Sequence, residues 1–181
     1  MNNIKLEKLL NTQLDGNAIQ KLTKSPIIKY PEFNNMSSID DAFKKSDSVI
    51  IFFEIEDAYS GHWTCMMKRG NEIEFFDPYG LKQDDEFNYV TMHTREELNE
   101  QFEPLSKLLN NSNYKVIHNP YKIQKFEFPF NSKIVRPQTC GRHSALRLMN
   151  KDKTLEQHIL DTYTKNNKLG NDDIISCYLI N

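Results

Sequence analysis

Three short apolar runs between residues 48 and 77 restrict what this chain can fold into. They read SVIIFFEI (48–55), HWTCMMKRG (62–70) and EIEFFD (72–77), and each is rich in β-branched or aromatic residues. All three have the length of a strand, and Gly70 with Asn71 supplies turn chemistry between the second and the third. The pattern predicts a meander of three strands.

Helical patterns lie on both sides of these strands. Apolar residues recur at helical spacing in four regions of the chain. They predict one or two short helices in 1–25, a helix over 94–111 that Pro104 breaks or kinks, a mostly buried helix from Cys140 to about Asn150, and a helix from about Thr154 to Tyr163. The segment 130–139 (FNSKIVRPQT) reads as irregular. The chain is therefore predicted to be α+β.

The length and composition indicate one globular domain. At 181 residues the chain is long enough to bury a substantial core. We expect a helical lead-in (1–40) followed by a core (41–181). A formal net charge of −2 gives no general attraction to nucleic acid. No apolar run approaches the roughly 18 residues of a membrane span, and three cysteines without an apolar signal segment favour free thiols.

The stretch QTCGRHS (138–144) places a cysteine at the start of a predicted helix. Thr139 is the expected N-cap, which puts Cys140 in the first turn, where unpaired amides and the helix dipole favour an anion. A thiolate is the reactive form of cysteine, and Gly141 leaves room for a substrate backbone. On this stretch alone, both an activated nucleophile and an ordinary buried thiol remain open.

A histidine and an aspartate fall at the same end of the predicted meander. His62 opens one strand and Asp77 ends the next, so a hairpin brings the imidazole and the carboxylate together. A carboxylate in this place orients a histidine that serves as base for a thiol. A structural zinc site made from HWTC and CGRH is the competing interpretation. Strand geometry argues against it, because His62 and Cys65 are three residues apart and face opposite sides.

The ordered set GHW, FFDPYG, HNPYKIQ and TCGRHSALRL resembles the superfamily of adenovirus and SUMO proteases, which are cysteine peptidases. It is most similar to the virion-maturation branch found in large DNA viruses, virophages and related transposons. The resemblance covers roughly residues 40–150. It implies an adenain-like, papain-related α+β fold, in which helices flank a central mixed β-sheet and the nucleophile begins a helix.

The resemblance also implies the roles of individual residues. Cys140 matches the nucleophile, His62 the general base and Asp77 the group that orients the base. Trp63 matches the aromatic residue that follows the histidine, and it reads equally well as a core tryptophan. Trp63 and Gly141 are the expected substrate-binding residues.

The family has a glutamine whose side-chain amide joins the oxyanion hole. Gln124, at the end of HNPYKIQ, is the predicted residue, although its separation from Cys140 is unusually long. Gln138, two residues before the nucleophile, is the alternative.

Three more residues of the cysteine segment need an interpretation. His143 lies one helical turn from Cys140 but has no evident orienting carboxylate, so we expect a structural role. Arg142 and Arg147 are expected on a solvated or ion-paired face.

The resemblance implies a viral endopeptidase that cuts capsid or other structural precursor proteins after small residues such as glycine. We expect a monomer without a cofactor, located in the virion and in the viral factory of the host-cell cytoplasm. The adenovirus enzyme uses DNA and a peptide as activators, and the charge of this chain does not support nucleic acid in that role. The alternatives are a SUMO or ubiquitin-like-specific protease, an effector-type acetyltransferase and a structural zinc-binding protein.

Overall fold

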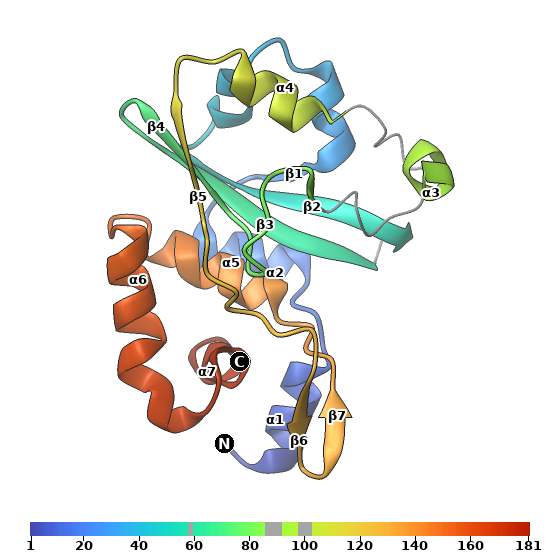
Figure 1. Cartoon of the computed structure of the whole chain (residues 1–181), viewed down its shortest axis with the longest axis vertical. Helices are drawn as coiled ribbons and strands as arrows, with labels where there is room; N and C mark the ends of the chain where they lie inside the picture. The colour runs from blue at the N-terminus through green and yellow to red at the C-terminus, as the bar shows by residue number, and fades with distance from the viewer. Residues whose placement is uncertain (58–59, 86–91, 98–102) are drawn as a thin grey trace.

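The computed structural model describes residues 1–57, 60–85, 92–97 and 103–181 (Figure 1). Within these residues the chain is an α+β structure with a mixed five-stranded sheet and flanking helices. In sheet order the strands are β1 (Ile27–Lys29), β2 (Ser48–Asp57), β3 (Ser60–Arg69), β4 (Glu72–Phe76) and β5 (Lys115–His118). The antiparallel meander β2-β3-β4 is confirmed, and β1 and β5 add to its edges in parallel.

Both faces of the sheet are buried. Because side chains alternate along a strand, Trp63, Cys65 and Met67 of β3 point to one face. That face is covered by α5 (Cys140–Met149), on which α2 (Gly16–Thr23) packs. Phe53 and Met66 point to the other face. There the cover is formed by η1 (Tyr30–Asn35), η2 (Ile39–Phe43) and α4 (Pro104–Asn110).

A further group of elements lies beyond α5, in the lower part of Figure 1. It consists of α1 (Asn3–Leu10), the hairpin β6 (Phe128–Phe130) and β7 (Lys133–Val135), α6 (Leu155–Thr162), η4 (Thr164–Leu169) and α7 (Asp172–Leu179). Leu6 and Leu10 of α1 are buried with Val135 of β7 and Cys177 of α7. Residues near the two ends of the chain therefore pack together beneath the start of α5.

Two sequence expectations are corrected by the fold. The predicted helix over 94–111 is divided into α3 (Met92–Glu97) and α4, which begins at Pro104, because proline suits the first helical position and not a helix interior. Residues 98–102 of that prediction lie outside the described residues. The segment 130–139 was expected to be irregular, yet it contains β7. The φ values of Asn131 (49°) and Ser132 (62°) give the left-handed turn that closes a short hairpin.

Arg147 is fully buried at the end of α5, so its expected exposure is wrong, although it is ion-paired. Its Nε and Nη2 lie 2.6 and 2.9 Å from the carboxylate oxygens of Glu74 on β4. The same guanidinium donates to the carbonyl oxygens of Asn150 and Lys153. This bidentate pair fixes the C-terminal end of α5 to the sheet, and losing one partner would leave a buried charge.

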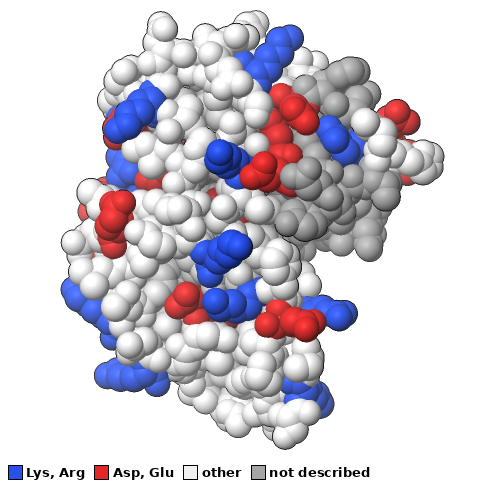
Figure 2. All heavy atoms as spheres, in the orientation of Figure 1, with Lys and Arg blue, Asp and Glu red and all other residues white. Residues whose placement is uncertain are grey.

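Acidic and basic side chains are interspersed on the face shown in Figure 2, without a large patch of one sign. This distribution agrees with the small net charge. Among the helices that the structure describes, none is long and apolar enough to cross a membrane.

Candidate active site

His62 and Asp77 meet at one end of the meander, as the sequence predicts. His62 is the third residue of β3, and Asp77 directly follows β4. The Nε2 atom of His62 lies 2.6 Å from Oδ2 of Asp77. Both residues are buried, with 3 % and 0 % of their surface exposed. The carboxylate therefore fixes the orientation of the imidazole ring.

The turn after β4 holds the Asp77 carboxylate in place. Its Oδ1 accepts hydrogen bonds from the backbone N–H groups of Tyr79 (2.6 Å) and Leu81 (3.4 Å). The side-chain amide of Asn119 donates to the carbonyl oxygens of Asp77 (2.6 Å) and Tyr121 (3.0 Å). Asn119 lies in the motif HNPYKIQ, at the end of the stretch YKVIHN (114–119), and no spacing rule in the sequence marks it as a partner of Asp77.

Gln124 is connected to the histidine through Tyr79. The Tyr79 ring stacks on His62, with ring centroids 5.2 Å apart, and the Tyr79 hydroxyl accepts a hydrogen bond from Gln124 Nε2 (2.9 Å). The same nitrogen donates to the carbonyl oxygen of Pro137 (2.8 Å). Gln138 has an exposed side chain, and its backbone N–H donates to Leu10 O (2.7 Å).

Cys140 is the first residue of α5, and 4 % of its surface is exposed. Thr139 is the N-cap by position, but it does not cap with its side chain. Its hydroxyl instead donates to Oδ1 of Asp173, at 2.5 Å. Among the described residues, the backbone N–H groups of Cys140 and Gly141 have no acceptor, as expected in the first turn of a helix. These two amides are available to an anion beside the sulfur.

Gln13, which the sequence reasoning did not consider, joins the cysteine to the start of β3. Its Nε2 donates to the carbonyl oxygen of Gly61 (2.7 Å) and lies 3.9 Å from the Sγ of Cys140. Since one nitrogen contacts both groups, the residue before His62 lies next to the cysteine sulfur. No sequence signal marks Gln13, because it lies between two short helices and matches no motif.

Arg142 is buried, which corrects its expected place on a surface. Its Nη1 donates to the carbonyl oxygen of Thr12 (2.7 Å) and its Nε to that of Ile180 (3.2 Å). Burial lowers the pKa of this guanidinium below its usual value. Arg142 therefore holds segments from both ends of the chain against the first turn of α5.

His143 has a carboxylate partner that the sequence did not reveal. Its Nε2 lies 3.2 Å from Oδ1 of Asp173, and its Nδ1 lies 2.8 Å from the hydroxyl of Tyr163. When Nε2 carries the proton that faces Asp173, Nδ1 accepts a hydrogen bond from the Tyr163 hydroxyl, whose pKa burial raises well above its usual value. Both ring nitrogens are thus engaged inside the core. His143 has the arrangement of a structural residue.

Comparisons with known proteins place the chain among viral proteins. No family model matches it. It is 35 % identical over 127 residues to "Uncharacterized protein V9" of the Sputnik virophage. The matched region covers 70 % of this chain and 68 % of that protein. The chain belongs to the family of virophage protein V9.

Two solved structures were also similar to this V9-family chain. "SUMO protease Ulp1 with the catalytic cysteine oxidized to a sulfinic acid" gives a TM-score of 0.32 at 13 % identity, over 97 % of this chain and 75 % of that one. "Crystal structure of the de-sumoylating protease" gives 0.36 at 13 % identity, over 98 % and 76 %. Both scores are too low to support an argument.

A mostly apolar groove of about 410 Å³ opens beside the candidate site of this V9-family protein. It is lined by Gln13, Leu14, Asp15, Gly16, Ile27, Lys29, Phe52 and Trp63. The Trp63 ring packs against Phe52, with ring centroids 4.3 Å apart. A Cβ atom at Gly141 would lie 3.2 Å from the Trp63 ring, so the absence of a side chain at Gly141 lets α5 pack closely against Trp63 of β3. Trp63 is thus both a core residue and part of the groove wall.

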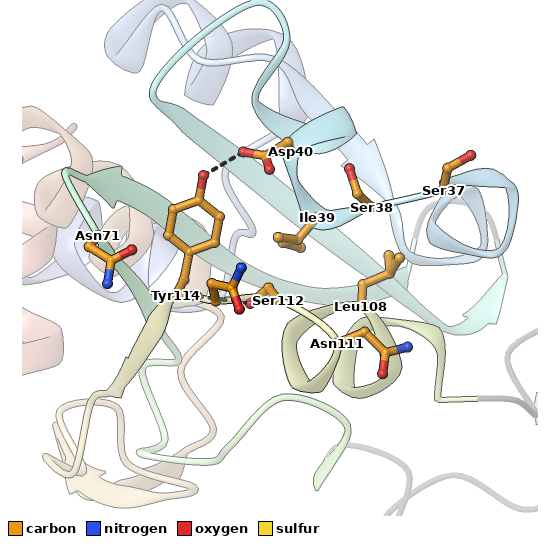
Figure 3. Close-up of a pocket in the computed structure, with 10 residues that line it drawn as sticks. Ser37, Ser38, Ile39, Asp40, Asn71, Leu108, Asn111, Ser112 and Tyr114 are labelled. Atoms are coloured by element: carbon orange, nitrogen blue, oxygen red, sulfur yellow. Dashed lines mark hydrogen bonds between the residues drawn. The ribbon is translucent and has the colours of Figure 1, made fainter.

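A polar pocket of about 330 Å³ lies between η2, α4 and the start of β5, where the hydroxyl of Tyr114 donates to Asp40 (2.7 Å; Figure 3). None of the predicted site residues lines it. Across residues 1–57, 60–85, 92–97 and 103–181, no group of three or more His, Cys, Asp or Glu side chains is arranged to hold a metal ion.

Proposed function

We propose that this V9-family protein is a cysteine endopeptidase with Cys140 as nucleophile, His62 as base and Asp77 as the residue that orients the base. The observation that carries the proposal is the buried His62–Asp77 pair, which lies at the start of β3 beside the first turn of α5. The same three residues match the motif order of the adenovirus and SUMO protease superfamily. An adenain-like, papain-related fold is part of this proposal.

The chemistry follows from the positions of these groups. The sulfur of Cys140 attacks a peptide carbonyl carbon while His62 takes the thiol proton. The backbone N–H groups of Cys140 and Gly141 donate to the oxyanion. The C–N bond then breaks, and His62 gives the proton to the leaving amine. Water hydrolyses the thioester, which releases the carboxylic acid product and restores the thiol.

The remaining predicted residues have supporting roles. Trp63 contacts the substrate at the groove. Gly141 stays the sequence-based prediction for a second substrate contact, although it does not line the groove. Gln124 remains the sequence-based prediction for a side-chain oxyanion donor, with Gln138 as its alternative. Gln124 would have to give up its bond to Tyr79 or to Pro137 in order to donate there.

The biological task we propose is maturation of virus particles. The substrates are capsid or other structural precursor polypeptides, cut after small residues such as glycine, in the virion and in the viral factory of the host cytoplasm. The kinship with a virophage protein supports a viral role, and the motif resemblance supports precursor cleavage. We propose a monomer that requires no cofactor.

The test compares wild type with Cys140→Ala and His62→Ala on candidate capsid precursors and on glycine-containing peptides. Both variants should lose cleavage, because one lacks the nucleophile and the other lacks its base. His93→Ala is the matched control, since the His93 side chain is 81 % exposed on α3, and it should cleave like wild type. Cleavage that survives in Cys140→Ala would reject the proposal.

Three further measurements on the wild-type protein separate the competing functions. Preferred cleavage after a diglycine tail would indicate a SUMO or ubiquitin-like-specific protease. Acetyl transfer from acetyl-CoA without peptide hydrolysis would indicate an acetyltransferase. Stoichiometric zinc, with unfolding when a chelator removes it, would indicate a structural zinc protein.

A further inference from the structure

Three hydrogen bonds hold the segment that carries Gln13 in place, two at the start of α5 and one on β3. The backbone N–H of Gln138 donates to Leu10 O (2.7 Å), and Nη1 of Arg142 donates to Thr12 O (2.7 Å). The third bond is made by the Gln13 side chain itself, to Gly61 O. The side-chain amide is therefore held by bonds to the cysteine helix and to β3.

An amide nitrogen carries two hydrogens, and only one of those of Gln13 is needed for Gly61 O. The second can be directed at the sulfur of Cys140, which lies 3.9 Å from the same nitrogen. When the sulfur attacks a substrate carbonyl carbon, the carbonyl oxygen can lie close to both the sulfur and the Gln13 amide nitrogen, because these two atoms are 3.9 Å apart. Gln13 also lines the apolar groove together with Trp63.

The two glutamines that the sequence nominated are less well placed to donate. Both amide hydrogens of Gln124 already have acceptors, namely the Tyr79 hydroxyl and the Pro137 carbonyl. The side chain of Gln138 is exposed, and it is the backbone of Gln138 that contacts the N-terminal segment.

We propose that Gln13 is the side-chain donor of the catalytic centre: it donates to the Cys140 sulfur in the resting enzyme and to the oxyanion during attack. This inference rests on the proposed peptidase function. It assigns to a residue of the N-terminal lead-in the role that the motif pattern gives to Gln124. Gln13 transfers no proton and forms no covalent bond. It stabilises negative charge first on sulfur and then on oxygen.

The experiment uses Gln13→Ala and Gln13→Glu in the full chain, with Gln20→Ala as the matched control. Gln20 is an exposed glutamine on α2, and its side chain makes no hydrogen bond to any of the described residues. The first measurement is alkylation of Cys140 by iodoacetamide against pH, followed by peptide mass spectrometry. Burial raises the pKa of Cys177 to about 11 and that of Cys65 well above its usual value, so these thiols serve as unreactive internal references.

We expect both Gln13 variants to move the alkylation profile of Cys140 to higher pH. The shift should be larger for Gln13→Glu, because a carboxylate replaces a donor beside the thiolate. Gln20→Ala should match wild type. This readout needs no substrate, so it tests the contact with sulfur even if the peptidase proposal fails.

The second measurement is peptide cleavage by the same variants and by Gln124→Ala. Gln13→Ala should lower kcat about 10²–10³-fold, the usual effect of removing one oxyanion donor, with little change in KM. An alkylation profile or a kcat for Gln13→Ala equal to that of Gln20→Ala would overturn the proposal. A full kcat loss in Gln124→Ala alone would return the role to Gln124. If wild type cleaves nothing, the peptidase proposal fails instead.

Discussion

Replacing Asp173 by Asn should destabilise the protein and disturb the cysteine segment. Asp173 lies in the first turn of α7 and is fully buried. Its Oδ1 accepts from the Thr139 hydroxyl (2.5 Å) and faces Nε2 of His143 (3.2 Å), while its Oδ2 accepts from the backbone N–H of Lys125 (3.1 Å). One carboxylate thus connects the residue before Cys140 with the residue after Gln124.

The loss of stability expected for Asp173→Asn follows from the number of hydrogen-bond acceptor oxygens that each side chain offers. Asparagine has the size of aspartate but only one acceptor oxygen, so its NH₂ group must face either the Lys125 N–H or the Thr139 and His143 donors. At least one hydrogen bond to a charged acceptor is lost, and a buried donor is left without a partner, which costs about 1.5–3 kcal/mol. For a domain of this size each kcal/mol lowers Tm by about 2–4 °C. We therefore expect a decrease of about 3–12 °C.

The assay is thermal unfolding followed by circular dichroism, together with cleavage rates. Asp172→Asn is the matched control, because Asp172 is the half-buried neighbour in the same helical turn and its side chain makes no hydrogen bond to the described residues. The Asp173 variant should also cleave more slowly, since both Thr139 and the Gln124 segment lose an anchor. Equal Tm values for the two variants would refute the reasoning.

Two other predictions concern the residues around this network. Burial lowers the pKa of His158 to about 3, compared with about 6.5 when the chain is unfolded, so between these values only the unfolded state binds the proton. Stability should therefore fall as pH falls from 6.5 to 3, by up to about 1.4 kcal/mol per pH unit, and His158→Asn should flatten this slope in acid unfolding measured against wild type. Gly141→Ala should lower Tm by about 2–4 °C in the same thermal assay, because the new Cβ would lie 2.9 Å from Ile19 and 3.2 Å from Trp63. A raised Tm would show that the better helix propensity of alanine outweighs this crowding.

The parts of the fold that the sequence predicts well are those with local signals. The meander β2-β3-β4 follows from β-branched and aromatic runs with a turn between them, and α5 follows from its apolar spacing. The His62–Asp77 contact follows in turn from the hairpin, because antiparallel pairing brings the two strand ends together. The sequence does not predict β7, because its three residues (Lys133–Val135) are too few to show the alternation of a strand, and the turn before it at Asn131 and Ser132 has no glycine to mark it.

The contacts that the sequence could not predict join residues that are far apart in the chain. Asp173 is 34 positions from Thr139, and Gln13 is 127 positions from Cys140. Pairs at such separations follow from how helices pack, and no spacing rule describes them. A single sequence also gives a buried arginine such as Arg142 the same appearance as an exposed one, which is why its burial was not foreseen.

These distant contacts change how the predicted division of the chain should be understood. Residues 1–40 were expected as a lead-in to a catalytic core, yet Thr12 accepts a hydrogen bond from Arg142 and Gln13 contacts Cys140. Ile180 accepts a second bond from the same guanidinium. Because Arg142 is in the first turn of the cysteine helix, its bonds attach both segments to the helix that carries the nucleophile. The geometry of the candidate site therefore depends on residues near both ends of the described chain, in addition to the four motifs between residues 61 and 148.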